Sequence, residues 1–384
     1  MAGAAGSSVT AGPPIEVPWL IDINRFRLTT VGTLDNGSFA IVGLNAYFDA
    51  NNLIVTALVA QFFRPDGAPQ TRPTILIQPP AVVLSTGIGS VGDRYFLAVK
   101  DEKRTYARFY SEAGTPLGSP FRWPYSDIEY FMTYYRFGSA PLWRFLPITY
   151  HLIGYDQDED PLYNSFFQVA DADGVRLGVP VALPNVVDAA INGTGRFVVI
   201  EQPCTPMCTV GIQIFDSAVH PLTPLLSAGV PQSEEPGGVL NSEALTAINN
   251  QGQILLVWLT NPDDSYAKRV VARLFGETGA PASEVIQLTP PGYGERLAQP
   301  IALGDGSFLV SWQVQSPSLR TTVFMKRIDP STMTASEPTV LAAGDLGNWV
   351  VSVNGSGRGV FTWQMLFPDS APSGAFLRTI RVTP

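Results

Sequence analysis

A glycine-containing turn followed by an apolar strand recurs along the whole chain. Clear copies are DNGSFAIVG, GTGRFVVIE, QGQILLVW, GDGSFLVSW and GSGRGVFTW. The recurring strands begin at Ser38, Arg94, Arg196, Gln253, Ser307 and Arg358. The spacings are 56, 102, 57, 54 and 51 residues, and because 102 is twice 51, we expect a diverged copy near residue 145, in WRFLPITYHLIGY. A nearly constant period of this length indicates a repeat architecture.

Each repeat also contains three other short runs that are typical of strands. In one repeat they are ALTAINN before the turn, VVARLFGETGAP after a variable loop, and EVIQLTP at the end. Four such runs joined by hairpin-length turns predict an antiparallel meander. One four-stranded sheet cannot cover both of its faces, whereas seven sheets arranged radially can. The sequence therefore predicts an all-β fold, a seven-bladed β-propeller of four-stranded antiparallel blades.

The two ends of the chain suggest how such a ring would close. The last repeat supplies three strands, WVVSV, GVFTWQM and AFLRTIRV, and lacks a fourth. An extra strand-like run, IEVPWLIDIN, extends from Ile15 to Asn24 before the first repeat. We expect this run to complete the last blade and so to remove an open sheet edge. The predicted organisation is a flexible N-terminal segment over residues 1–14 and a single propeller domain over residues 15–384.

The charge of the chain narrows the choice of partners. The formal net charge is −9 and the isoelectric point is about 4.8. An acidic surface repels phosphate backbones and anionic lipids, so we expect no nucleic-acid partner and no attachment to a charged membrane surface. No window approaches the ~18 consecutive apolar residues that indicate a spanning helix, so no membrane insertion is expected. The start, MAGAAGSSVTAGPP, lacks the basic and apolar stretches of a signal peptide, so we expect either that the protein is not exported by that route or that the chain is already trimmed.

The repeat also carries a family resemblance. The pattern Gly-x-Phe-x-Val-x-Trp, then a variable loop, then x-Ala-x-x-Phe-x-x-x-Gly-x-Pro, is clearest from Gly306 to Trp312 and from Val271 to Pro281. It resembles a repeat common in large bacterial surface and secreted proteins. That resemblance implies a non-catalytic propeller that adheres or displays, located outside the cell or on a particle surface. The tryptophan is absent from the first, second and fourth repeats, and the Trp–Asp, kelch and sialidase signatures are absent.

The connections between the second and third strands of the repeats concentrate acidic residues. Five of the seven contain aspartate, and the densest is YDQDEDPLY, with Asp156, Asp158 and Asp160 at alternating positions. Carboxylates so arranged suit Ca²⁺, which accepts flexible oxygen geometry. A solvated acidic loop is the alternative reading. Calcium is the one cofactor that the sequence suggests.

Aromatic residues lie in the same connections. Exposed aromatic rings beside carboxylates can hold a sugar by stacking and hydrogen bonding, although some of these tyrosines could instead be strand residues of an irregular third blade. The predicted ligand-binding residues are Tyr47, Asp49, Tyr155, Asp156, Tyr163, Asp263 and Tyr266.

Other reactive residues are few. Cys204 and Cys208, in CTPMC, are close enough for a disulfide, and the bridged and free forms both stay open. His151 is predicted on a strand and His220 in a turn, both with structural roles. Glu201 replaces the tryptophan of its repeat, and burial among strand residues would raise its pKa. We predict no catalytic residues.

Three Asn-Gly-Ser/Thr triplets begin at Asn36, Asn192 and Asn354 and match glycosylation sequons. All three fall in the recurring turn, and we expect them to be there because Asn-Gly supplies positive φ angles.

The sequence thus favours a non-catalytic recognition scaffold that binds a glycan or protein through one loop face. The alternatives are a structural subunit of an extracellular or virion assembly, forming a homo- or hetero-oligomer, and a glycoside hydrolase-like enzyme with its site in the central funnel.

Overall fold

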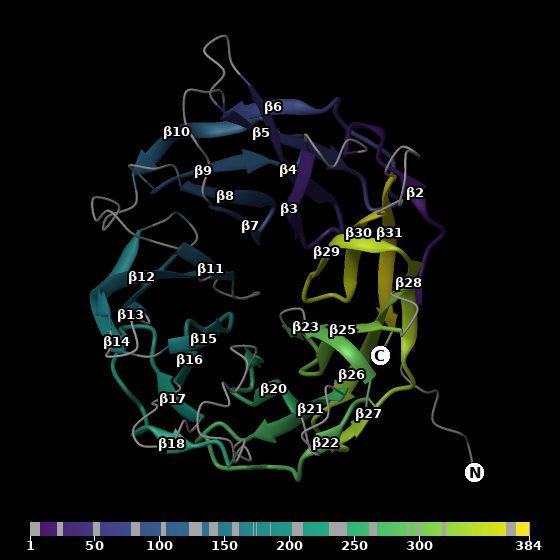
Figure 1. The fold of residues 1–384 in the computed structure, drawn as a ribbon. Helices are drawn as coiled ribbons and strands as arrows, with labels where there is room; N and C mark the ends of the chain where they lie inside the picture. The colour runs from purple at the N-terminus through teal and green to yellow at the C-terminus, as the bar shows by residue number, and fades with distance from the viewer. Residues whose placement is uncertain are drawn as a thin grey trace. The chain divides into compact units, whose positions relative to one another are not determined.

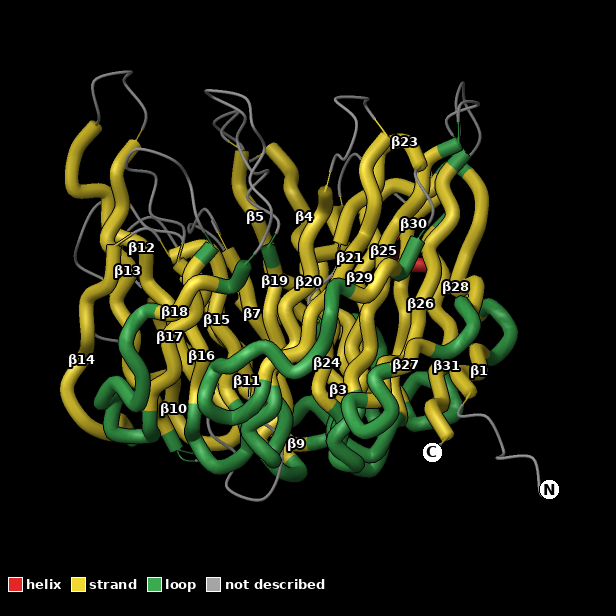
Figure 2. Tube along the Cα trace, turned by 90° about the horizontal axis from the view of Figure 1, so that it is seen from below, coloured by secondary structure: helices red, strands yellow, loops and turns green. Residues whose placement is uncertain are grey.

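The computed structural model is built almost entirely of β-strands (Figures 1 and 2). Its only helix among the described residues is the 3-10 helix η1 (Pro18–Leu20). The described chain divides into two compact units: a larger unit of Met1–Val9, Arg136–Ala342 and Pro384, and a smaller unit of Thr10–Tyr135 and Ala343–Thr383. The structure describes residues 8–20, 26–48, 54–77, 85–100, 105–122, 133–137, 145–155, 161–171, 173, 175–184, 186–201, 210–229, 244–260, 267–289, 292–297, 300–316, 320–365 and 374–383.

The smaller unit contains three antiparallel sheets whose strands follow in chain order. The first consists of β3 (Phe26–Thr33), β4 (Phe39–Phe48), β5 (Ile54–Phe63) and β6 (Thr74–Ile77). The second consists of β7 (Ser85–Val91), β8 (Arg94–Lys100), β9 (Thr105–Ser111) and β10 (Pro116–Arg122). The third contains β29 (Leu346–Val353), β30 (Arg358–Met365) and β31 (Ala375–Thr383).

The larger unit contains two four-stranded sheets and one larger sheet. The four-stranded sheets are β11 (Thr133–Phe137), β12 (Phe145–Tyr155), β13 (Pro161–Ala170) and β14 (Arg176–Pro184), then β15 (Val186–Ile191), β16 (Phe197–Glu201), β17 (Gly211–Phe215) and β18 (Leu226–Ser227). The large sheet begins with β19 (Leu245–Ile248), β20 (Ile254–Thr260), β21 (Ala267–Phe275), β22 (Ile286–Gln287) and β23 (Gly292–Leu297). It continues with β24 (Ile301–Ala302), β25 (Phe308–Gln315), β26 (Thr321–Asp329), β27 (Thr334–Ala335) and β28 (Thr339–Gly344).

The large sheet arises because one strand joins two repeats. Strand β23 pairs with the start of β21, where Ala267 faces Tyr293, and with the end of β25, where Leu297 faces Trp312. The sequence analysis placed no strand here, between the fourth run of one repeat and the first run of the next. Two successive repeats are therefore hydrogen-bonded into one sheet.

Strands begin at or next to each of the expected repeat positions. The expected strands near 38, 94, 145, 196, 253, 307 and 358 correspond to β4, β8, β12, β16, β20, β25 and β30. In each case the strand begins within one residue of the expected start, including the diverged copy at Phe145. Each of these strands pairs antiparallel with the next strand in the chain.

The N-terminal segment pairs with the last strand, but not as a single long strand. Strands β1 (Ser8–Ala11) and β2 (Ile15–Glu16) both pair with β31. The prediction of a flexible segment over residues 1–14 is therefore wrong from Ser8 onward. The strand predicted from Ile15 to Asn24 ends at Glu16, because Pro18 has no N–H to continue the ladder and begins η1 instead. Residues 21–24 lie outside the described residues.

Side chains fix this N-terminal segment to the sheets of the smaller unit. Val17 and Leu20 are fully buried in a cluster with residues of β4 and β31. The indole of Trp19 donates to the side chain of Gln61 at 2.6 Å, and the Gln364 amide donates to the carbonyl of Leu20 at 3.2 Å. The segment is thus part of the core rather than an appendage.

The recurring glycine turn has one geometry in five repeats. The N–H of its first residue donates to the carbonyl of the fifth at 2.7–3.0 Å, and the N–H of the fourth donates to the carbonyl of the first at 2.9–3.1 Å. The fourth residue is always a glycine with φ between 76° and 92°. The turns span residues 34–38, 192–196, 249–253, 303–307 and 354–358.

This geometry corrects the explanation of two sequons. The positive φ falls on Gly195 and Gly357, the fourth turn residues, and not on the glycine that follows Asn192 or Asn354. These asparagines occupy the first position, where the side-chain oxygen accepts hydrogen bonds from the third and fifth backbone N–H groups. Asparagine is found there because it caps the turn.

The second recurring pattern, Phe-x-x-x-Gly-x-Pro, forms the turn between the third and fourth strands. In three sheets the phenylalanine and proline form an isolated antiparallel bridge, and a hydroxyl two residues after the proline accepts the N–H of the residue before the phenylalanine. The pairs are Phe63 with Pro69, Phe215 with Pro221 and Phe275 with Pro281. The proline fits because this edge position requires no N–H donor.

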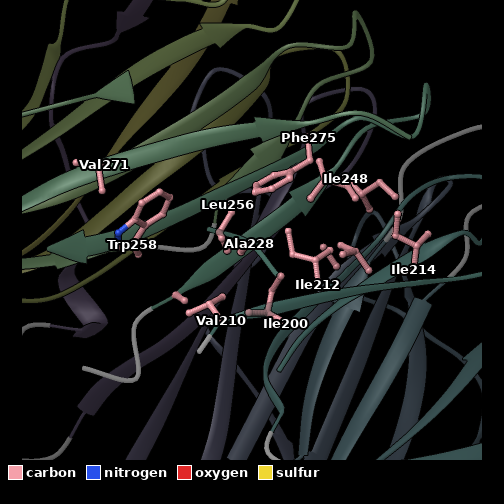
Figure 3. Close-up of a cluster of buried hydrophobic side chains, with 14 residues drawn as sticks. Ile200, Val210, Ile212, Ile214, Ala228, Ile248, Leu256, Trp258, Val271 and Phe275 are labelled. Carbon is pink, nitrogen blue, oxygen red and sulfur yellow. The ribbon is translucent and has the colours of Figure 1, made fainter. Parts of the chain in front are cut away.

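The core lies between successive sheets of each unit. In Figure 3, Ile200, Ile212 and Ile214 of one sheet meet Leu256 and Phe275 of the next, with the labelled side chains facing one another across the junction. The opposite face of β20 and β21 packs in turn against β25 and β26. Sheets covered on both faces explain why apolar residues are buried on both sides of β20 and β16.

Candidate functional site

The connections that carry the predicted site each join the second and third strands of a sheet. Among the described strands, β4 and β5, β12 and β13, β16 and β17, and β20 and β21 are the antiparallel neighbours concerned. Because the glycine turns join the first and second strands, the second-to-third connections leave each sheet at the opposite end. Asp49, Asp156, Asp158, Asp160, Cys204, Cys208, Asp263 and Tyr266 lie outside the described residues.

Three predicted tyrosines lie on strands next to these connections. Tyr47 is the penultimate residue of β4 and faces Val55. Tyr155 is the last residue of β12, where it faces Pro161. Tyr163 faces Leu152 on the neighbouring strand. Their backbones therefore place them at the loop ends of two sheets; the surroundings of their side chains are outside the described part of the structure.

Glu201 lies at the base of one connection, as the last residue of β16. Its side chain is buried, with 7% exposure, and partial burial raises the pKa of its carboxyl above the usual value. The prediction of a buried glutamate with a raised pKa is confirmed. A neutral carboxyl in this position avoids the desolvation penalty of a buried charge.

The neighbouring strand carries a buried acid that the sequence analysis did not single out. Asp188, on β15, accepts the N–H of Thr246 of the next sheet at 2.8 Å and is 1% exposed. An acid inside the short apolar run DAAING was the signal available in the sequence. Asp188 therefore joins two sheets at their first strands.

These two acids do not form a carboxylate pair. Glu201 faces Val186 and shares its face of β16 with Val199, which packs toward β13. Asp188 faces Ile200 and points the other way, toward β19. Because the two side chains lie on opposite faces of one sheet, they cannot act on one glycosidic bond as an acid and a nucleophile.

The strand tryptophans near the loop ends are core residues. Trp258 and Trp312 are buried in two successive junctions of the larger unit, and Trp363 is buried in the smaller unit. Trp312 stacks on Phe324 with ring centroids 5.8 Å apart. We therefore expect these rings to report changes in the sheets and not to contact a ligand themselves.

The histidines occupy the predicted kinds of position. His151 lies on β12. His220 closes the turn over residues 216–220, is exposed, and places its Nδ1 3.2 Å from the Asp216 carboxylate. Within the described ranges, histidine, cysteine, aspartate and glutamate side chains do not gather in groups of three that could hold a metal ion. No helix in the same ranges is long and apolar enough to cross a membrane.

Comparison with known proteins supports the fold. The sequence matches no family model and no curated protein. Polysaccharide lyase Uly1 has a similar structure, with a TM-score of 0.56 and 9% identity over 92% of this chain and 90% of that chain. The β-propeller domain of the Trilobed protease from Pyrococcus furiosus, which has an open velcro topology, gives 0.50 and 11% over 89% and 92%.

The Dos1 propeller also matches, with a TM-score of 0.51 and 8% identity over 96% of this chain and 94% of that chain. At these identities the likeness concerns the fold alone. The chain is therefore a β-propeller fold of four-stranded antiparallel sheets, with no activity assigned by these comparisons.

Proposed function

We propose that the chain forms one seven-bladed propeller whose ring is closed by its N-terminal strands. The pairing of β1 and β2 with β31 supports this, because the last repeat gains the outer strand that its own sequence lacks. Such pairing is not general to the fold, since the propeller domain of the Trilobed protease has an open velcro topology.

Removal of residues 8–20 tests the closure. The deletion exposes the edge of β31 and the cluster around Val17 and Leu20, so we expect a large loss of thermal stability or aggregation. Deletion of residues 2–7 is the control. An unchanged melting temperature in the longer deletion would contradict the proposal. Hydrogen exchange of the longer deletion distinguishes two explanations. If residues 8–20 close a ring, we expect faster exchange in both units. If they only dock locally, we expect faster exchange only in the sheets of the smaller unit.

We propose further that the molecule is a non-catalytic recognition scaffold outside the cell, binding a glycan or protein through its second-to-third connections. The observation that supports this is the contrast within each repeat. In five repeats the glycine-turn ends share one geometry, whereas the connections at the opposite ends differ in sequence, and five of the seven contain Asp. A uniform frame with variable loops is the usual arrangement of a binding protein.

A glycan-array screen with and without a chelator tests the binding. We expect binding that Tyr155→Ala and Asp156→Asn each weaken at least tenfold, about 1.4 kcal/mol, with unchanged melting temperatures. Asp66→Asn is the matched control, because Asp66 is an exposed acid on a turn between the third and fourth strands. Loss of binding in the chelator would support calcium at Asp156, Asp158 and Asp160. Absence of binding to glycans and to protein ligands alike would contradict the proposal.

A further inference from the structure

The three Asn-Gly pairs of the chain share one kind of turn but differ in what their side chains touch. They are Asn36–Gly37, Asn192–Gly193 and Asn354–Gly355. Asn-Gly is the dipeptide most prone to deamidation, because glycine has no side chain to block attack by its own backbone nitrogen. The structure distinguishes the three pairs by burial and hydrogen bonding.

Two of the asparagines are locked at the first position of their turns. Asn192 is 2% exposed, and its amide donates to the carbonyl of Asn249 in the next sheet at 3.0 Å. Asn354 is 5% exposed, and its amide donates to the carbonyl of Leu34 at 2.6 Å. The side-chain oxygen of each accepts two backbone N–H groups and one hydroxyl of its own turn.

Asn36 stands at the third position instead, and its side chain is exposed. Its side-chain oxygen accepts one backbone N–H, that of Ser38, at 2.8 Å. The asparagine oxygens at the other two sites each accept two backbone N–H groups. Asn36 also helps to hold the pKa of the Glu112 carboxyl, in the β9–β10 turn of the neighbouring sheet, below its usual value. Glu112 accepts the Ser38 hydroxyl at 2.6 Å and the Gln70 amide at 3.4 Å.

We propose that Asn36 is a modification site, where the folded protein deamidates spontaneously. The backbone nitrogen of Gly37 must first leave its hydrogen bond to the Leu34 carbonyl and lose its proton; it then attacks the side-chain carbonyl carbon of Asn36, forming a C–N bond. The bond to Nδ2 breaks, and ammonia leaves with the protons that the solvent supplies. Water then opens the cyclic imide at either carbonyl, giving aspartate or isoaspartate. No electrons are transferred, and water is the only co-reactant.

Asn192 and Asn354 are protected because deamidation would break hydrogen bonds of their buried side chains, and solvent does not reach these side chains to replace the bonds. Loss of the Asn192 or Asn354 amide removes one of the two donors to the carbonyl of Asn249 or Leu34, which keeps its turn bond, and such a bond contributes about 0.5–1.5 kcal/mol. Each buried asparagine makes several such bonds, so together they slow the reaction roughly tenfold or more, since 1.4 kcal/mol corresponds to a factor of ten. The exposed amide of Asn36 is replaced by solvent at little cost.

The product changes the contact between two sheets of the smaller unit. An aspartate at position 36 would replace a neutral amide that helps to lower the pKa of Glu112 by a second negative charge near it. Like charges at close range disfavour ionisation, so the pKa of Glu112, now held below its usual value mainly by the Ser38 hydroxyl, would rise. Deamidation would thereby loosen the junction between the β3–β4 and β9–β10 turns.

Peptide mapping of the intact chain, aged at mildly alkaline pH, tests the site. We expect deamidation at Asn36 at least about tenfold faster than at Asn192 and Asn354, and comparable rates at all three in concentrated urea, where no burial protects them. Equal rates in the folded chain, or conversion at Asn192 or Asn354 first, would overturn the proposal.

A second measurement tests the consequence. Asn36→Asp should melt at a lower temperature than Asn36→Ser, which removes the reactive amide without adding charge. Glu112→Gln in the Asn36→Asp chain should recover much of that difference, as expected for a direct coupling. No recovery would show that the added charge does not act through Glu112.

Discussion

The turns over residues 216–220 and 276–280 occupy the same place in neighbouring sheets of the larger unit, yet the fourth residue is a buried valine in the first turn and a glycine in the second. Their backbone hydrogen bonds match, from the first residue to the fifth and from the fourth to the first. The fourth residue has positive φ in both, 79° at Gly279 and 68° at Val219. Such an angle is ordinary for glycine and strained for a β-branched residue.

The choice of glycine or valine follows from whether a side chain of the preceding sheet already fills the space next to the fourth turn residue. At Gly279 an added Cβ would lie 2.6 Å from Cδ1 of Leu226, so the preceding sheet already occupies the position. At Val219 the side chain is itself buried, in a cluster with Phe167 and Val169 of β13. The comparison shows that packing against the neighbouring sheet can hold a strained residue where the local backbone favours glycine.

The largest loss of stability is expected when Gly279 is replaced by a residue with a side chain. Gly279→Val combines strain at positive φ with the collision against Leu226, so we expect a loss of about 2–5 kcal/mol in the free energy of unfolding, measured in urea. Gly279→Ala, with a smaller side chain, should lose less. A loss below about 1 kcal/mol for the valine would mean that the neighbouring sheet shifts freely.

The reverse change should have a much smaller effect. Val219→Gly removes buried methyl groups but also relieves strain of about 1–3 kcal/mol, so we expect a net loss below about 1.5 kcal/mol. Val199→Gly is the matched control, because Val199 is buried in the same cluster on a regular strand. It should lose about 3 kcal/mol or more. Equal losses for the two variants would contradict strain at Val219.

The smallest effect concerns the first residue of the turns, where Asp216 corresponds to Gly276. Partial burial raises the pKa of Asp216, but hydrogen bonds from His220 and Ala218 outweigh it and hold the pKa below the usual value. Because this carboxylate is 38% exposed, we expect Asp216→Gly to lose only about 0.5–1 kcal/mol at neutral pH.

The same residue predicts a dependence on pH. A carboxyl with a lowered pKa in the folded state contributes stability that is present above its unfolded pKa of about 3.9 and is lost as the pH falls through the folded value. Urea titrations at neutral and acidic pH should therefore show the wild type and Asp216→Gly converging below pH ~4. A constant difference across that range would show that the hydrogen bonds do not depend on the charge.

Several predictions from the sequence hold because they depend on local pattern alone. The strand beginning at Phe145 was located by arithmetic on the repeat, without a clear glycine turn. The buried Glu201 followed from its place in the strand pattern. Periodicity is sufficient here, since every repeat must bury the same strand positions.

Other features depended on contacts that no local pattern encodes. Strand β23 exists because β21 and β25 offer edges on both of its sides. The N-terminal run ends at Glu16, and the earlier strand β1 forms because β31 provides a partner for Ser8 to Ala11. The opposite orientation of Asp188 and Glu201 follows from an irregularity in register between Val186 and Asp188.

By itself, the sequence determined the repeat, its four-stranded unit, and the residues that begin each second strand. Glycine turns and alternating apolar residues act over a few positions, so they can be recognised wherever they occur. Only the tertiary structure decided which asparagines are buried, which turn carries a strained valine, and which strand completes the last sheet. Those outcomes depend on atoms supplied by another sheet, at sequence distances that no local rule spans.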